Sequence, residues 1–309
     1  MLFSESFIEG SGTVISFRPY SHEPYVSEDA VKVRDFLIRI NSTELQAPRL
    51  LWGAWDWAVN HALRDQEHVH RIGMWEDDGR LVALATYELN LGEAILVVEK
   101  GYDALKPELV AYAVERLHSH GDLRLLLPDE DECLQLAALE TGFRPTRQIE
   151  RFAKIHVSRI SKESLPHGFS YVSLADEWDW RQYNQVMWRG FDHDGNAPDD
   201  AATIAGRKKM LSSPAILPEL IVAIASPEGK YVAHCGVWYR PGDRYSYVEP
   251  VVTDPTYRGK GFGKSVVYEA IIRSGKLGAE QAIVASDQMF YYSIGFVPFR
   301  TMTQWQLHN

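Results

Sequence analysis

The spacing of hydrophobic positions changes repeatedly between a period of two residues, which indicates strands, and a period near 3.6, which indicates helices. In the first half this pattern predicts strands near residues 14–20, 70–76, 80–90, 93–99 and 123–127. The helices predicted between them begin after Ser27, cover 107–118 and end at Gly142. Ser27 is a residue type that caps helix N-termini. The first half is therefore predicted to be a mixed α/β segment.

The second half repeats this plan. Strands are predicted near residues 168–174, 219–225, 231–240, 244–253, 281–285 and 297–307, with helices at 261–273 and ending at Gly295. The turn glycines Gly79 and Gly229 lie 150 positions apart, and the helix-end glycines Gly142 and Gly295 lie 153 apart. Two landmarks with nearly the same offset indicate a duplicated module. The polar segment 156–168 is the expected linker, so we predict modules at residues 1–160 and 161–309.

Composition narrows the class of protein. The chain has 309 residues, of which 45% are hydrophobic and 24% charged, and these are values of a folded globular protein rather than a disordered one. The net charge of −10 argues against a general nucleic-acid binder, because binding to phosphates needs a surplus of Lys and Arg. Cys133 and Cys235 have neither disulfide-framework nor zinc-site spacing. Without a leader-like start or a long apolar run, we expect a cytoplasmic protein with no membrane partner.

The segment from Val251 to Lys264 carries the clearest chemical signal, because a predicted strand runs into a glycine-rich turn that begins a helix. Free N–H groups at a helix N-terminus bind anions, and glycines let a ligand approach the backbone closely. A Walker A loop would need glycine where the chain has Arg258, and a GxGxxG fingerprint would need glycine where it has Lys264. The pattern present throughout is Arg258-x-x-Gly261-x-Gly263.

This pattern resembles the acetyl-CoA diphosphate loop of the GNAT superfamily of acyltransferases. The later Tyr291-x-x-x-Gly295-Phe296 looks like the helix-to-strand signature of the same superfamily. The motifs cover about residues 168–309, and the repeat makes the whole chain similar to a tandem GNAT protein. The resemblance implies an α/β fold of two GNAT-like modules in tandem, each a mixed, mostly antiparallel sheet flanked by helices.

The resemblance also implies a donor site in the second module. The pantetheine arm would pair with the backbone of Val251, Val252 and Thr253, and the diphosphate would lie on the loop that follows. The loop residues expected to bind it are Arg258, Gly259, Lys260, Gly261, Phe262, Gly263 and Lys264. For the lysines, a solvated helix face is an equally good interpretation.

Two residues are candidates for proton transfer. Tyr291 stands where the superfamily places a tyrosine beside the thiol sulfur, and a phenol can protonate a departing thiolate; the alternative is an aromatic packed at a helix end, and Tyr292 is the neighbour if the register differs. Glu249 is the candidate general base, because period-two alternation places it on one strand face with Tyr247, Val251 and Thr253. The alternative is an exposed strand glutamate.

The first module departs from the superfamily pattern at the corresponding loop. No glycine occurs from Tyr102 to His120, Glu108 lies where a phosphate would sit, and Ala138 stands in the place of Tyr291. We therefore predict a degenerate, non-catalytic module. Asp192 and His193 are interpreted as part of a polar loop, and His234 and Cys235 as packing residues.

These observations predict an acetyl-CoA-dependent N-acetyltransferase that acts on a primary amine of a small molecule or peptide, with no metal. The competing hypothesis is a non-enzymatic acyl-CoA-binding regulatory module, because a fold is often retained after its chemistry is lost. The pattern of residues identifies neither the acceptor nor the oligomeric state.

Overall fold

A computed structural model describes residues 6–7, 14–21, 23, 27–42 and 44–308. The start of the chain, on which the expectation of no leader rests, lies mostly outside these ranges. The chain forms two compact units, Met1–Phe152 with Phe299–Asn309, and Ala153–Pro298. The predicted modules 1–160 and 161–309 differ from these units because two long strands, β7 (Phe143–His156) and β13 (Val297–Leu307), each pass from one unit into the other.

The first unit is built on a mixed sheet with strand order β1-β2-β3-β4-β5-β6-β13-β7. Its remaining strands are β1 (Ser6–Phe7), β2 (Val14–Pro19), β3 (Gly73–Asp77), β4 (Arg80–Thr86), β5 (Glu93–Val98) and β6 (Arg124–Pro128). Pairs from β1 to β5 are antiparallel, whereas β5 and β6 are parallel. From Leu81 to Thr86, β4 is buried at every residue, which places it at the centre of the core.

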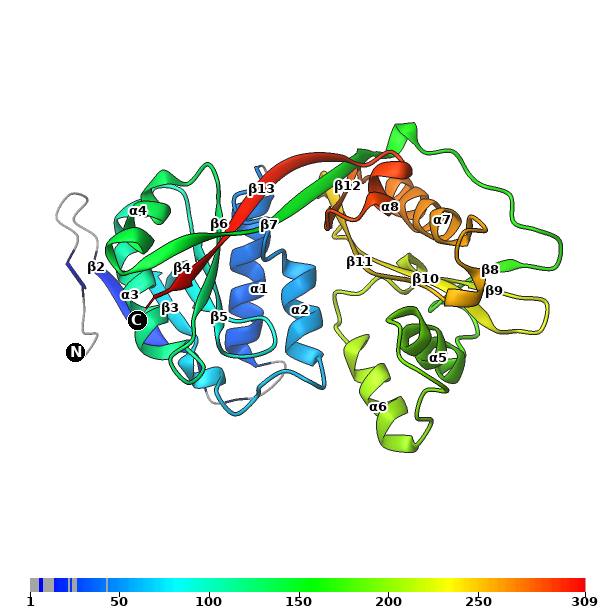
Figure 1. The fold of residues 1–309 in the computed structure, drawn as a ribbon, viewed down its shortest axis with the longest axis horizontal. Helices are drawn as coiled ribbons and strands as arrows, with labels where there is room; N and C mark the ends of the chain where they lie inside the picture. Colours follow the sequence, from blue (N-terminus) through cyan, green and yellow to red (C-terminus); the bar gives the residue numbers. More distant parts are fainter. Residues whose placement is uncertain (1–5, 8–13, 22, 24–26, 43, 309) are drawn as a thin grey trace. The chain divides into compact units, whose positions relative to one another are not determined.

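The α-helices that cover this sheet in the described ranges are α1 (Glu28–Asn41), α2 (Trp52–Asn60), α3 (Lys106–Arg116) and α4 (Glu132–Glu140). Helices α1 and α2 lie on one face, and α3 and α4 on the other (Figure 1). Ser27 caps α1 as predicted, because its hydroxyl accepts a hydrogen bond from the Ala30 amide at 3.1 Å.

The second unit has a sheet with strand order β7-β12-β11-β10-β9-β8. Its own strands are β8 (Ser170–Ser173), β9 (Ile221–Ala225), β10 (Tyr231–Trp238), β11 (Tyr245–Thr253) and β12 (Gln281–Ala285). Strands β8 to β11 pair in antiparallel fashion, and β11 pairs with β12 in parallel. Strands β9 and β10 are buried along their whole length, as expected for a sheet covered on both faces.

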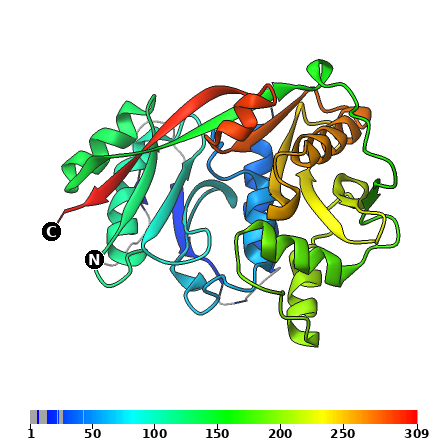
Figure 2. The same cartoon turned by 45° about the vertical axis from the view of Figure 1, so that its right-hand side comes forward.

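The helices of the second unit are α5 (Trp180–Gly190), α6 (Ala201–Met210), α7 (Phe262–Lys276) and α8 (Met289–Ser293). Helices α5 and α6 lie on one face of the sheet and α7 and α8 on the other, an arrangement that both views show (Figures 1 and 2). Two buried clusters follow from this layering. One packs α7 on the sheet around Val248 and Val266, and the other packs α5 around Tyr183 and Val252.

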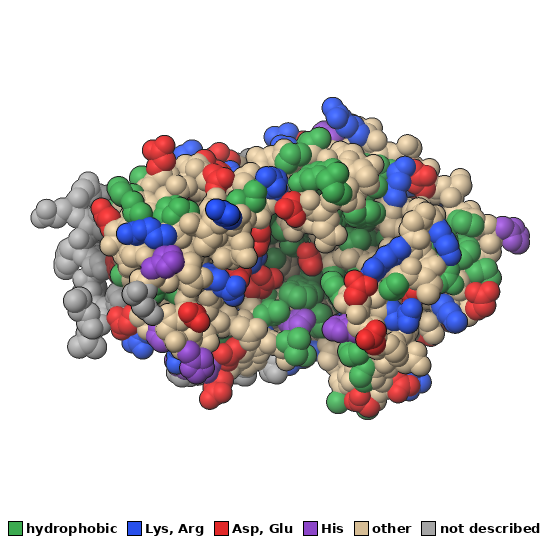
Figure 3. All heavy atoms as spheres, in the orientation of Figure 1, with side chains coloured by type: hydrophobic (Ala, Val, Ile, Leu, Met, Phe, Trp, Pro, Cys, Tyr) green, Lys and Arg blue, Asp and Glu red, His purple; other side chains and the backbone are tan. Residues whose placement is uncertain are grey.

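The structure confirms the predicted mixed α/β class. The predicted bounds of β12 and β13 match those observed, and the other predicted strands agree within a few residues. Most of β7 escaped prediction, because its residues from Arg144 to Glu150 are exposed or half-buried and show no hydrophobic alternation. Among the described residues, no helix has the length and hydropathy that a bilayer crossing requires. On the face of the second unit shown in Figure 3, basic and acidic side chains are interspersed.

Candidate functional site

Strand β11 presents an open backbone edge near its C-terminal end. Its parallel pairing with β12 covers only Tyr245 to Tyr247. On its other side it stays paired with β10 as far as Thr253, which lies opposite Ala233. Strands β11 and β12 therefore separate where β11 approaches the glycine-rich turn, and an extended ligand can pair with the free backbone edge of β11.

A bulge changes which face the residues of β11 present. Cys235 lies opposite Val251 and Val237 opposite Val248, so three steps along β11 face two along β10. Val248 and Val251 consequently both pack toward α7. The prediction that Glu249 shares one face with both Tyr247 and Val251 by strict alternation is therefore wrong. Glu249 keeps Tyr247 as its neighbour, with 3.5 Å between the Tyr247 hydroxyl and Glu249 Oε2.

The turn after β11 forms an anion cradle at the start of α7. It consists of the 3₁₀ helix η5 (Pro255–Tyr257), then Gly259 and Gly261, then α7. Gly261 is the N-cap residue with φ +87°, in the left-handed region that favours glycine. A Cβ on Gly263 would lie 3.0 Å from Thr253 Oγ1 and 3.3 Å from the Phe290 ring, so a side chain there would crowd the end of β11. The cradle therefore exposes helix N–H groups without a covering side chain.

A cavity of about 720 Å³ lies at this cradle. It brings together most of the predicted donor-binding residues: Val251, Val252, Thr253, Arg258, Gly259, Gly261, Gly263 and Lys264. Phe290 and Tyr291 line it from the α8 side, and Gly190 to Asp192 from the end of α5. Among the described residues, Lys260, Phe262 and Glu249 lie outside its lining. Phe262 packs instead against Phe169, with ring centroids 4.7 Å apart.

The basic side chains of the cradle already have partners. Arg258 donates to the carbonyl oxygens of Thr253 at 3.2 Å and Gly190 at 2.8 Å. Lys264 contacts Glu163 at 2.7 Å, and this carboxylate raises the pKa of Lys264. Lys260 donates to the Thr256 carbonyl at 2.9 Å. The binding roles predicted for all these residues remain predictions, and the geometry makes the backbone amides the least obstructed donors.

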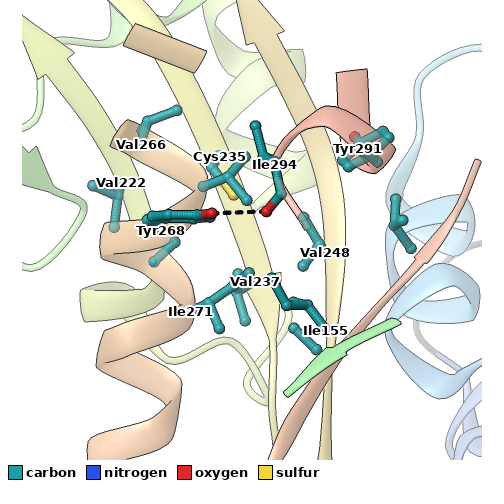
Figure 4. Close-up of a cluster of buried hydrophobic side chains, with 14 of the residues drawn as sticks. Ile155, Val222, Cys235, Val237, Val248, Val266, Tyr268, Ile271, Tyr291 and Ile294 are labelled. Carbon is teal, nitrogen blue, oxygen red and sulfur yellow. Dashed lines mark hydrogen bonds between the residues drawn. The ribbon is translucent and has the colours of Figure 1, made fainter. Parts of the chain in front are cut away.

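Tyr291 and Glu249 come together in the second unit. Tyr291 is 7% exposed and lines the cavity. Burial raises the pKa of Tyr291, and the nearby Glu249 carboxylate raises it further. The phenol therefore stays protonated and can serve as a hydrogen-bond donor. Tyr268 of α7 donates to the Ile294 carbonyl at 2.7 Å and so ties the α8 segment that carries Tyr291 to α7 (Figure 4).

Cys235 lies beneath this site, but its environment makes it inert. The side chain is wholly buried, and burial followed by the charge of Glu249 raises the pKa of the Cys235 thiol. A nucleophilic cysteine needs access and a thiolate, and this position offers neither. Within the described residues there is also no group of three His, Cys, Asp or Glu side chains that could hold a metal ion.

The corresponding turn of the first unit is filled by the chain's own side chains. Lys106, the first residue of α3, contacts Asp103 at 2.6 Å and Asp131 at 2.7 Å. Glu108 in the first turn accepts a hydrogen bond from Trp75 Nε1 at 2.9 Å. A carboxylate and an ion-paired lysine thus lie at the helix start where the second unit has a bare glycine cradle.

Phe290 and Glu163 are among the contributors to the second-unit site that sequence reasoning missed. Phe290 borders both the cavity and Gly263, and Glu163 reaches Lys264 from the loop that precedes β8. Phe290 could be assigned to the site only by knowing how α8 packs beside the start of α7. No local pattern identifies Glu163, which is about a hundred positions from its partner.

Comparison with known proteins agrees with this geometry. Residues 176–296 match the model of the acetyltransferase (GNAT) family. No curated protein sequence matches the chain. A similar solved structure is a GCN5-related N-acetyltransferase from Sphaerobacter thermophilus, with 15% identity, coverage of 94% of this chain and 95% of the other, and a TM-score of 0.58. A tandem GNAT protein from the clavulanic acid biosynthesis pathway has 14% identity, coverage of 94% and 98% of the two chains, and a TM-score of 0.59. A GNAT-family acetyltransferase from Colwellia psychrerythraea has 11% identity, coverage of 95% and 100%, and a TM-score of 0.57. The second half of the chain is therefore similar to the acetyltransferase (GNAT) family, and the fold of the whole chain is similar to that of a tandem, two-module GNAT protein.

Proposed function

We propose that the protein is an acetyl-CoA-dependent N-acetyltransferase with one donor site per chain, in the second unit, and a primary amine of a small molecule or peptide as acceptor. The observation that carries this proposal is the cavity in which the open edge of β11, the bare cradle of α7 and Tyr291 meet. A thioester, a diphosphate and a proton donor are the features of an acyl-CoA reaction that such a site can serve.

The donor would lie along the open strand edge. The pantetheine amides would pair with the backbone of Val251 to Thr253, and the diphosphate would accept hydrogen bonds from the amides around Gly261 and Gly263. This direction places the thioester away from the cradle and toward Tyr291. No contact in this arrangement requires a metal ion.

Direct transfer is the reaction type that the residues favour, because the buried Cys235 thiol cannot act as an acyl carrier. The amine nitrogen would bond to the acyl carbon while the carbon–sulfur bond breaks. Glu249 would take the proton that the amine loses, and Tyr291 would donate a hydrogen bond or proton to the departing sulfur. The raised pKa of Tyr291 makes complete proton transfer harder, so its main contribution would be the hydrogen bond.

A single site per chain follows from the contrast between the two helix starts. In the first unit, Glu108 would repel a diphosphate, and Lys106 is engaged by two aspartates. The first module would then be non-catalytic.

The donor site is tested by titration calorimetry, which measures acetyl-CoA binding to the parent protein and to the Gly261→Asp variant. The substitution adds bulk and negative charge at the cradle, so binding should be lost. Gly229→Asp is the matched control, because Gly229 has φ +79° and also has no atom within 4 Å of an added Cβ, but it lies in the turn between β9 and β10. Two binding sites per chain, or unchanged affinity in Gly261→Asp, would contradict the proposal.

A non-enzymatic acyl-CoA-binding module is the second candidate, and one observation favours it: Glu249 lies outside the cavity lining among the described residues. A free-thiol assay over a set of small amines and peptides separates the two. An enzyme releases CoA in the presence of an acceptor, whereas a sensor binds acetyl-CoA without turnover.

A further inference from the structure

Two carboxylates neutralise two of the cations that line the donor cavity. Asp192 Oδ1 lies 2.8 Å from Arg258 Nη1, and Glu163 Oε1 lies 2.7 Å from Lys264 Nζ. Both Arg258 and Lys264 line the cavity at the α7 cradle. The side chains that would attract a diphosphate are therefore already paired with anions of the protein.

Both carboxylates come from loops rather than from the cradle itself. Asp192 lies in the segment between α5 and α6, and Glu163 lies between the 3₁₀ helix η3 (Val157–Arg159) and β8. Asp192 has φ +62°, a left-handed conformation that a non-glycine residue adopts only at some cost in free energy. Its side chain is 69% exposed and that of Glu163 is 35% exposed. Ion pairs at such exposed positions are weak and can be exchanged for another anion.

Arg258 does not depend on Asp192 for its position. Its Nε and Nη2 atoms donate to the carbonyl oxygens of Thr253 and Gly190, which join the end of β11 to the end of α5. Neutralising Asp192 therefore leaves the guanidinium at the cradle. Lys264 is held similarly by its place in the first turn of α7 and by the Tyr268 ring, whose centroid is 5.1 Å from Nζ.

We propose that Asp192 and Glu163 are displaceable counter-anions of the cradle, which compete with the donor's diphosphate for Arg258 and Lys264. This inference rests on the proposed donor site. Each carboxylate lowers the affinity for a diphosphate by occupying a cation and by repelling a second anion. The protein thereby holds acyl-CoA more weakly than the same cradle with neutral side chains, and discriminates less against pantetheine donors without a diphosphate.

Calorimetry of the full-length protein with CoA, inorganic pyrophosphate and pantetheine tests the proposal on Asp192→Asn, Glu163→Gln and the double variant. Each single variant should bind CoA and pyrophosphate about two- to fivefold more tightly at low salt, which is the range of a surface charge interaction. Affinity for pantetheine should stay unchanged. The gain should shrink at 0.5 M NaCl, where the Debye length falls below about 5 Å.

Asp194→Asn is the matched control, because it removes one negative charge from the same loop, and the exposed Asp194 carboxylate forms no ion pair within the described part of the chain. It should leave all three affinities close to those of the parent. Equal or weaker binding of CoA and pyrophosphate in both Asp192→Asn and Glu163→Gln overturns the inference, as does a gain that pantetheine shares. If the variants gain affinity for pyrophosphate but neither the parent nor any variant binds CoA, the inference about the counter-anions holds and the proposed function is wrong. If the parent and variants bind neither, both fail.

Discussion

His234 of β10 should make the second unit sensitive to acid. The side chain is wholly buried between the sheet and α5, with its ring centroid 5.0 Å from that of Tyr183 and 6.1 Å from that of Trp178. In the described part of the chain neither ring nitrogen has a partner with hydrogen-bond geometry. Burial lowers the pKa of His234 to about 3. The nearby Val222 backbone opposes this shift, and the positive charge of Arg207 on α6 lowers the pKa slightly further.

The size of the effect follows from proton linkage. An unfolded histidine has a pKa near 6.5, so between about pH 6.5 and 3 the unfolded state binds one more proton at this position than the folded state. This uptake of a proton by the unfolded state destabilises the folded state, so the free energy of unfolding falls as the pH falls from about 6.5 to 3. Above about pH 6.5 the destabilisation is absent. The maximum slope is about 1.4 kcal/mol per pH unit, which amounts to about 2 to 3 kcal/mol between pH 7 and 4.5.

Urea unfolding of the parent and of His234→Leu, followed by tryptophan fluorescence and circular dichroism, measures this difference. Leu fills a similar volume and removes two buried ring nitrogens that lack a partner with hydrogen-bond geometry, so the variant should be at least as stable as the parent at pH 7.5. It should lose about 2 to 3 kcal/mol less than the parent on acidification to pH 4.5. The control is His167→Leu, at an exposed loop position, which should follow the parent. Parallel pH dependences of the parent and His234→Leu would refute the reasoning.

The remaining predictions concern catalysis and the division of the chain. Tyr291→Phe should lower kcat by about 100- to 1,000-fold, the range for one hydrogen bond to developing negative charge, with nearly unchanged donor affinity; a rate within about threefold of the parent would remove Tyr291 from the mechanism. Glu249→Gln should lower kcat similarly and abolish the acid limb of the pH profile; an overlaying profile would mean that the amine arrives neutral. A fragment of residues 161–309 should be insoluble or much less stable, because it lacks the buried Ala153 and Ile155 of the second-unit core. A well-folded, active fragment would contradict this.

Local signals explain which parts of the fold can be predicted from the sequence. The cradle is visible because glycines at 259, 261 and 263 follow a strand and precede a helix, and each of these features is encoded within a few residues. Strand β7 is not visible in the same way. It is held by backbone pairing with β12 and β13, which lie more than a hundred positions away in the sequence. Its exposed Arg144 and Arg147 give this segment the polar character of a linker.

The face on which Glu249 lies could not be derived from alternation, because alternation assumes an unbroken ladder. The bulge between the Cys235–Val251 and Val237–Val248 pairs shifts the period by one residue, and every position beyond it changes face. A bulge leaves no reliable mark in hydrophobicity. Only the three-dimensional structure therefore shows that the Glu249 carboxylate lies near enough to Tyr291 to raise its pKa.

The difference between the two units can be traced to how their equivalent helices begin. Neither helix has a side-chain cap, but α7 begins after Gly261, which has no side chain to cover the first amides, so these stay available to a ligand. Helix α3 begins with Lys106, Pro107 and Glu108, and the charged side chains there bind other parts of the first unit. Because these side chains occupy the helix start, introducing one glycine in the first unit would not create a donor site. The lysine and glutamate contacts would have to be removed as well.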